Sequence, residues 1–235
     1  MRRIALPILS LLLLPLFSLH AAGEVDLLWQ GETYTPPFYK GRALWGTQAR
    51  IVFTAIPNLP NTDPASLYYR WSKNGTVLGS LSGFNKRSLT ISDTILSLPV
   101  EIKVDLRDGE EGKVLGSSSV TLSPISAFLL VVEDNPLYGL LLNKTIGATF
   151  ALEEQEVSFA ALPLYAPVTS RNVPALVYAW NTSAGDARTG NKVTYRVPEN
   201  SSGTSAITLR VTNTRVLIPP LEKSFLIEFG NQPGI

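Results

Sequence analysis

Two stretches of the chain, Leu67-Tyr68-Tyr69-Arg70-Trp71 and Leu176-Val177-Tyr178-Ala179-Trp180, repeat one Tyr-x-Trp pattern at an offset of 109 residues (180 − 71). Before them, Ile51-Val52-Phe53-Thr54-Ala55-Ile56-Pro57 returns as Val157-Ser158-Phe159-Ala160-Ala161-Leu162-Pro163 at an offset of 106 residues (163 − 57). Ordered matches at one period indicate a tandem duplication. The 235-residue chain is therefore predicted to hold two domains of about 100 residues, each large enough to bury a core.

The pattern within each half is typical of β-strands. Segments 50–55, 100–106 and 206–212 alternate apolar with polar residues at a period of two, as half-buried antiparallel strands do. Turn signals such as Asn74-Gly75 and Gly185-Asp186 separate these segments, and no long stretch has helical periodicity. Several short strands with a tryptophan on a central one predict an all-β chain of two Greek-key β-sandwiches.

The expected strands and domain bounds follow from this pattern. In the first half we expect strands at 25–29, 49–55, 67–73, 76–80, 88–92, 100–107 and 115–122, and in the second half at 128–133, 148–152, 156–162, 175–181, 191–196, 205–212 and 222–229. The predicted domains are 24–124 and 125–235. Their join, 123–127, is too short and too apolar for a flexible tether. We therefore expect the domains to sit end to end with limited freedom.

The first 23 residues have the order of a secretory signal peptide. Arg2 and Arg3 precede an apolar run over 4–19, and Ala21-Ala22-Gly23 follows. We expect cleavage after Gly23, with a cut after Ala21 as the alternative. The apolar run is shorter than the ~20 residues of a spanning helix, which favours cleavage over a retained anchor. The chain is thus expected to be exported, to an extracellular, cell-surface or periplasmic location.

Charge and cysteine content narrow the classes of partner. The chain holds 20 basic and 19 acidic side chains, and removal of Arg2 and Arg3 leaves 18 and 19, a net charge of −1. Such a chain has no basic field for nucleic acid or anionic lipid. It contains no cysteine, so the exported domains must be held together by their cores and not by disulfides.

The stretch Tyr69-Arg70-Trp71-Ser72-Lys73-Asn74-Gly75 resembles the aromatic-x-Trp strand and turn of immunoglobulin-like and polycystic-kidney-disease-type (PKD) domains. Segments 195–203 and 207–213 likewise resemble the late strands of PKD-type repeats, although the Asp-Phe-Gly-Asp-Gly turn usual there is absent after both Trp71 and Trp180. The resemblance implies two tandem immunoglobulin-like Greek-key β-sandwiches. The whole mature chain also resembles an uncharacterised family of exported proteins from candidate-phylum bacteria, which implies a fold and export but no activity.

Side chains needed for common catalytic sites are missing. The single histidine, His20, lies in the predicted signal, so the mature chain has neither histidine nor cysteine for a nucleophilic triad or a zinc site. The dense acidic groups lie at 108–111 and 153–156, and adjacent acids on a strand point to opposite faces. We therefore expect no catalytic residue, no cofactor and no enzymatic activity.

One acidic segment leaves a calcium site open as an alternative. Asp105, Asp108, Glu110 and Glu111 lie within seven residues, and calcium binds several oxygen ligands. The same segment contains Asp108-Gly109, an ordinary hairpin turn between two predicted strands. The turn is the preferred interpretation, and no metal is expected.

The duplication separates scaffold residues from candidate binding residues. An aromatic residue that both halves keep is most simply explained by the shared fold. We therefore assign three pairs to packing, which are Tyr69 with Tyr178, Trp71 with Trp180, and Tyr39 with Tyr138. Aromatic residues without a counterpart are candidates for stacking on a sugar ring, with core or edge-covering roles as the alternative. They are Trp29, Tyr34, Phe38 and Trp45.

Two loops, 79–87 and 182–192, are also unshared between the halves. Loops on a rigid scaffold commonly carry recognition. Together with the unmatched aromatics they define a predicted binding surface. It comprises Trp29, Phe38, Trp45, Phe84, Lys86, Arg87, Asp186 and Arg188.

These observations favour a non-enzymatic, exported cell-envelope or surface protein that acts as a spacer, adhesion or protein-interaction module. Its expected partner is a protein or a glycan at the cell surface. One alternative is a carbohydrate-binding module that uses Trp29, Phe38 and Trp45, and another is an accessory component of a surface appendage. No contact with nucleic acid is expected, and contact with a membrane only through an uncleaved signal.

Overall fold

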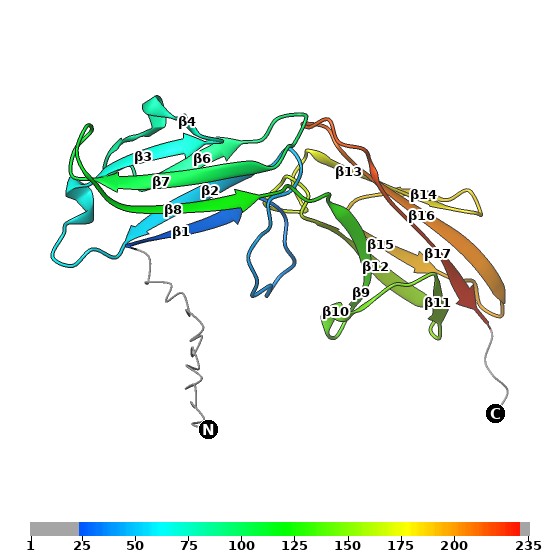
Figure 1. Cartoon of the computed structure of the whole chain (residues 1–235). Helices are drawn as coiled ribbons and strands as arrows, with labels where there is room; N and C mark the ends of the chain where they lie inside the picture. The colour runs from blue at the N-terminus through cyan, green and yellow to red at the C-terminus, as the bar shows by residue number, and fades with distance from the viewer. Residues whose placement is uncertain (1–23, 231–235) are drawn as a thin grey trace, which may run out of the picture.

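The computed structural model describes residues 24–230 and places them in two β-sandwiches that lie end to end (Figure 1). The predicted signal peptide, 1–23, lies outside the described residues. Between residues 24 and 230 the helices are two short 3-10 turns, at Pro64–Ser66 and Gly79–Leu81. Neither is long or apolar enough to cross a membrane.

The first sandwich packs one sheet of order β1-β2-β6 against another of order β4-β3-β7-β8, with β5 beside β3. Its strands are β1 (Val25–Gly31), β2 (Arg50–Pro57), β3 (Tyr68–Lys73), β4 (Thr76–Val77), β5 (Gly83–Phe84), β6 (Ser88–Ser92), β7 (Val100–Arg107) and β8 (Val114–Leu122). Taken as A, B and E opposite C, F and G, the six longer strands have the immunoglobulin arrangement.

The second sandwich repeats this arrangement with additions at its edges. Its sheets have the orders β10-β9-β12-β15 and β11-β17-β16-β13-β14, and β11 runs parallel to β17. Its strands are β9 (Phe128–Asn135), β10 (Gly139–Thr145), β11 (Thr149–Leu152), β12 (Glu156–Leu164), β13 (Leu176–Thr182), β14 (Ala187–Thr189), β15 (Lys192–Arg196), β16 (Gly203–Asn213) and β17 (Leu221–Phe229). The predicted fold class, two tandem immunoglobulin-like sandwiches, is confirmed.

Each strand predicted from alternation is present, and three additional ones are found. β5 and β14 are two and three residues long, too short for a period to be visible. β10 lies at a sheet edge and carries three consecutive leucines at 140–142, which do not alternate with polar residues. Period-two patterning therefore finds strands with one buried face and misses short edge strands.

The repeated tryptophans form the centre of each core. Trp71 and Trp180 are both fully buried. Each indole Nε1 donates to a backbone carbonyl, of Lys86 at 2.8 Å and of Gly190 at 2.9 Å. A buried indole N–H without an acceptor would cost free energy, so the same solution in both halves confirms a packing role.

The repeated tyrosines two residues earlier behave in the same way. Tyr69 and Tyr178 are buried, and their hydroxyls donate to the carbonyls of Pro64 at 3.0 Å and Arg171 at 2.9 Å. Each bond ties strand C to the loop that precedes it. The predicted packing role is confirmed for this pair too.

For the third repeated pair, the predicted packing role is wrong. Tyr39 is 41% exposed and Tyr138 is 79% exposed, both in loops at strand ends. A loop position can be kept after duplication without being buried, because packing constrains strand residues more than turn residues.

The junction between the sandwiches is built from backbone hydrogen bonds. The Ile125 N–H donates to the carbonyl of Trp45 at 2.8 Å, and the Thr47 N–H donates to the carbonyl of Ile125 at 2.9 Å. Gly46 thereby forms a parallel bridge with Ile125, directly after β8. The chain that leaves the first sandwich is thus tied back to it before the second begins.

Side chains of the β1–β2 connection also reach the second sandwich. Tyr34 is 5% exposed and packs against Val132, Ala160 and Leu162 on the outer face of the β9-β12 sheet. On the other side of the junction, the Gln48 amide donates to the carbonyl of Leu217 at 2.8 Å and accepts from its N–H at 3.0 Å. Contacts on two sides support the expectation of limited freedom.

Replacement of Trp180 by alanine should destabilise the second sandwich by about 3 to 5 kcal/mol, because it removes the largest fully buried side chain there and leaves a cavity. Urea unfolding followed by far-UV circular dichroism measures the change. The matched control is Val177→Ala on the same strand, at a side chain that is 49% exposed, which should cost less than about 1 kcal/mol. Equal losses for both variants would contradict the assignment.

Replacement of Gly46 by alanine should loosen the junction. A Cβ at this position would overlap the carbonyl oxygen of Tyr165 and approach Thr33 Cγ2 at 3.0 Å, so the two sandwiches must move apart. Small-angle scattering should show a broader distribution of lengths than the parent chain gives. Gly147→Ala, where an added Cβ meets no atom within 4 Å, should leave the distribution unchanged.

Candidate functional site

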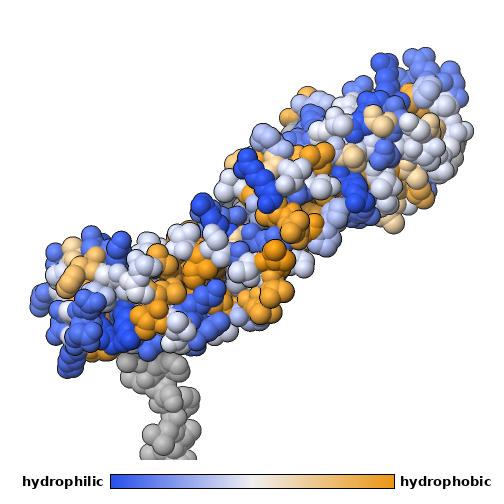
Figure 2. Space-filling view, turned by 90° about the horizontal axis from the view of Figure 1, so that it is seen from above, coloured by the Kyte–Doolittle hydropathy of each residue, from blue (hydrophilic) through white to orange (hydrophobic). Residues whose placement is uncertain are grey.

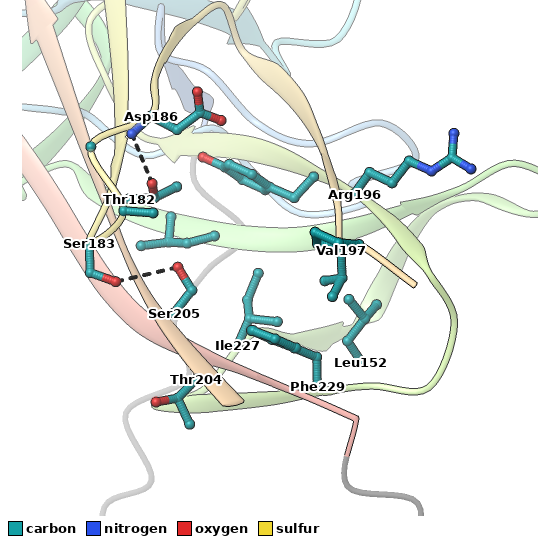
Figure 3. Close-up of a pocket in the computed structure, with 15 residues that line it drawn as sticks. Leu152, Thr182, Ser183, Asp186, Arg196, Val197, Thr204, Ser205, Ile227 and Phe229 are labelled. Atoms are coloured by element: carbon teal, nitrogen blue, oxygen red, sulfur yellow. Dashed lines mark hydrogen bonds between the residues drawn. The ribbon is translucent and has the colours of Figure 1, made fainter. Parts of the chain in front are cut away.

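A hollow of about 560 Å³ opens at the end of the second sandwich that faces away from the first. Figure 3 shows Leu152, Val197, Ile227 and Phe229 gathered on its apolar side. The turn 182–186 and the start of β16 form the polar side. The volume lies within the range of ordinary ligand pockets, roughly 300 to 1,000 Å³.

Polar contacts hold the turn beside the hollow in place. The Asp186 N–H donates to Thr182 Oγ1 at 3.1 Å, and the hydroxyls of Ser183 and Ser205 lie 3.4 Å apart across the entrance (Figure 3). These bonds close the β13–β14 hairpin over one edge of the opening. The apolar side is left without such a cover.

Tyr195 contributes an unpaired donor to the wall of the hollow. Its side chain is 8% exposed, and its buried hydroxyl has no hydrogen-bond partner among residues 24–230. Burial raises the pKa of Tyr195 to about 12, and the Arg188 guanidinium, 5.3 Å from the ring centroid, opposes this only in part. The hydroxyl is thus a neutral donor buried behind the wall of the hollow, and the ring of Tyr195 is part of that wall.

Acidic side chains surround a second hollow that shares Leu152, Val197 and Phe229 with the first. Four glutamates line it, and these are Glu153, Glu154, Glu199 and Glu228. The apolar side of the first hollow therefore adjoins a negatively charged rim. Such a rim favours a cationic group beside whatever fills the apolar part.

Two of the predicted site residues lie at this end. Asp186 and Arg188 form a salt bridge at 2.9 Å, with side chains 53% and 44% exposed. Arg188 Nη1 also donates to the carbonyl of Thr194 at 2.7 Å. The pair is therefore committed mainly to bracing the hairpin, since exposed ion pairs contribute little beyond local order.

The prediction for Trp45 needs correction, and the prediction for Trp29 stays open. Trp45 is 3% exposed, belongs to the core of the first sandwich and donates from Nε1 to the carbonyl of Ala49 at 3.1 Å, so it cannot stack on a ligand. Trp29 is half-buried, and the Arg42 guanidinium lies 4.6 Å from the centroid of its ring. A sugar-binding platform of Trp29, Phe38 and Trp45 is thus ruled out, because one of the three rings is inside the core.

Phe38 is the most exposed of the predicted aromatic residues. Its side chain is 94% exposed, and its backbone has a φ of 62°. A bulky residue in the left-handed region is strained. Strained backbone conformations are often found at functional sites, so Phe38 is a candidate for a functional role.

The remaining predicted residues lie at the outer end of the first sandwich. Phe84 is 58% exposed and packs edge-on against Tyr68 at 5.4 Å between centroids. Lys86 and Arg87 are exposed, and Arg87 Nε donates to Asn85 Oδ1 at 2.8 Å. The eight predicted residues are therefore divided among the outer end, the junction and the far end, and do not form one surface.

The acidic segment of the first sandwich contains an ion pair. Asp105 accepts from Lys103 Nζ at 2.9 Å and from Ser117 Oγ at 2.6 Å. Burial alone would raise the pKa of Asp105, but these two partners outweigh it and lower the pKa. Across 24–230 no three acidic side chains are grouped in a way that could hold a metal ion.

Leu152, Tyr195 and Phe229, which line the hollow, were not predicted as site residues. Each stands on a strand in an alternating pattern and has the sequence signature of a core residue. Only the register of the strands brings them to one end of the sandwich. A comparison of the two halves at the paired positions is the signal that could have found them.

Comparison with known proteins yields likenesses of fold. No family model matches the chain, and no curated protein sequence matches it. The structure is similar to the three N-terminal domains of the highly immunogenic outer capsid protein (Hoc) of bacteriophage RB49, with 17% identity, a TM-score of 0.46, and coverage of 88% of this chain and 59% of that one. It is also similar to immunoglobulin domains 1–4 of Sidekick-1, with 11% identity, a TM-score of 0.24, and coverage of 86% and 74%.

Removal of the Tyr195 hydroxyl should leave the stability of the second sandwich unchanged or slightly raised, because it relieves a buried donor without a partner. Tyr178→Phe is the matched control, since it breaks a 2.9 Å bond to the Arg171 carbonyl and should cost about 1 kcal/mol. Thermal unfolding of both variants measures the difference. A larger loss for Tyr195→Phe than for Tyr178→Phe would show that its hydroxyl has a partner.

Proposed function

We propose that this chain is an exported, non-enzymatic protein-interaction module of the cell envelope or cell surface. The observation that carries the proposal is the pair of immunoglobulin-like sandwiches joined end to end, with a hollow that has an apolar side at the end of the second sandwich facing away from the first. A braced junction holds that end at a constant distance from the rest of the chain. This geometry suits a spacer that presents a binding surface.

The polar chemistry of the site supports binding and not catalysis. Around the hollow, the described side chains supply one neutral phenol, serine and threonine hydroxyls, and a salt bridge. The mature chain has no histidine or cysteine to activate those hydroxyls. A protein ligand is favoured over a glycan because the apolar side of the hollow consists of aliphatic and phenyl side chains and presents no exposed aromatic platform.

Export follows from the order of residues 1–23 alone and belongs to the proposal. The resemblance to exported proteins of candidate-phylum bacteria points in the same direction. Attachment to a surface would place the two sandwiches outside the cytoplasm, where a fold without disulfides depends on its cores.

The test is the location and retention of the native protein. In cells that express it, antibodies should label intact, unpermeabilised cells or the periplasm after outer-membrane opening, and N-terminal sequencing should begin at Glu24, or at Ala22 for the alternative cut. Mild crosslinking should retain the chain with the envelope. A chain found free and monomeric in the medium, or in the cytoplasm with its first 23 residues intact, would contradict the proposal.

A further inference from the structure

The two sandwiches can be aligned by residue pairs on neighbouring strands of the same sheet. Trp71 pairs with Val104 on β7, and Trp180 pairs with Leu209 on β16, so Val104 and Leu209 occupy corresponding positions. In turn, β8 corresponds to β17, because Val104 pairs with Ser118 and Leu209 pairs with Lys223. The alignment makes the hollow comparable with the same place in the first sandwich.

On this alignment Ile125 corresponds to Gly230, the residue after Phe229. The parallel partner of Ile125 is Gly46, and Leu152 pairs with Phe229 in the parallel β11–β17 ladder. Trp45, directly before Gly46, therefore corresponds to Leu152. Both side chains are buried in their cores.

At a second pair of corresponding positions, too, the second sandwich has the smaller side chain. Val100 pairs with Leu122 in the first sandwich, and Ser205 pairs with Ile227 at the corresponding place in the second. Val100 is buried, whereas Ser205 is partly exposed and lines the hollow. The hollow thus lies where the first sandwich holds an indole and a valine, and its apolar part has room for an aromatic ring.

The chain itself carries an exposed aromatic ring of this kind. The β1–β2 connection projects from the junction (Figure 1). It carries Phe38, which is 94% exposed, in a turn at 37–38. Lys40 and Arg42 follow on the same loop and are exposed. The far hollow lies at the other end of the second sandwich, so a loop would reach the hollow of a neighbouring copy and not its own.

The β1–β2 loop and the surroundings of the hollow have opposite charges. Segment 36–42 of the loop has two cationic side chains and no acidic one. The rim beside the hollow has the four glutamates described above, and Arg196, the basic residue that lines the hollow, extends away from its apolar side (Figure 3).

We propose that the chain associates with a second copy of itself, with Phe38 of one copy filling the hollow at Leu152 of the other and Lys40 and Arg42 facing its glutamate rim. Figure 2 shows that hydrophobic side chains also gather over the middle of the upper face. The loop and the hollow are preferred because they match in shape and in charge. This contact would deepen the proposed function by naming its partner.

Sedimentation equilibrium over a concentration series up to millimolar tests the contact in chain 24–235. The parent chain should exceed the mass of a monomer, and Phe38→Ser and Leu152→Trp should each weaken self-association about tenfold or more, as expected for a lost anchor or a filled pocket. Leu152→Trp copies the residue that fills the first sandwich. Phe84→Ser, at the exposed aromatic of the outer end, is the matched control and should associate like the parent.

Complementation gives the decisive measurement. A mixture of Phe38→Ser and Leu152→Trp should associate, since one variant keeps the hollow and the other keeps the loop, although neither associates alone. If Leu152→Trp fails to fold, as judged by its thermal unfolding, Ser205→Val narrows the same hollow after the pattern of Val100. A parent that stays monomeric throughout the series, or variants that associate like the parent, would overturn the proposal.

The outcome is separable from that of the proposed function. A monomeric chain that is still retained on the envelope would overturn self-association alone. A chain that associates with itself but is found free in the medium would overturn only the surface role.

Discussion

The fold depends on one buried indole in each sandwich. Trp71 and Trp180 lie between the two sheets of their domains, and each must find an acceptor for its N–H because water cannot reach it. The carbonyls of Lys86 and Gly190 serve this purpose, and both belong to chain segments just before strand E. One side chain therefore joins the sheets by packing and fixes the connecting loop by a hydrogen bond. The tyrosines two residues earlier anchor the preceding loop in the same way.

The junction between the sandwiches is held by other interactions than the buried tryptophans, because it joins two separate cores. Backbone groups of Trp45, Thr47 and Ile125 form hydrogen bonds there. At Gly46, between them, a Cβ would collide with the Tyr165 carbonyl of the second sandwich. Tyr34 then adds apolar contact on the outer face of the β9-β12 sheet. The segment that links the domains is itself hydrogen-bonded to the first sandwich through Ile125. The linker is therefore short and fixed at its start. The bonded linker and the contacts across the junction therefore limit the movement of one sandwich relative to the other.

Duplication provides an internal comparison for the far end of the molecule. The first sandwich fills the end of its core with Trp45, next to the junction that it helps to form. The second sandwich has Leu152 in that place, and a hollow with an apolar side lies there beside four glutamates. Leu152 is smaller than the tryptophan at the corresponding position, so the end of the second core has space for a side chain from another molecule. This is a packing argument, and it holds whichever protein supplies the group.

The sequence by itself determined the duplication, the strands with one buried face and the two packed Tyr-x-Trp pairs, since alternation reports directly which side of a strand is buried. It also established that the chain has no cysteine and a single histidine, His20, within the expected signal peptide. Only the tertiary structure decided that Trp45 lies in a core while Tyr138 lies in the open, and that Leu152 and Tyr195 share a hollow. Exposure at a strand end or a loop depends on which distant segments pack there, and that depends on register and on the contact between domains, neither of which a local pattern contains.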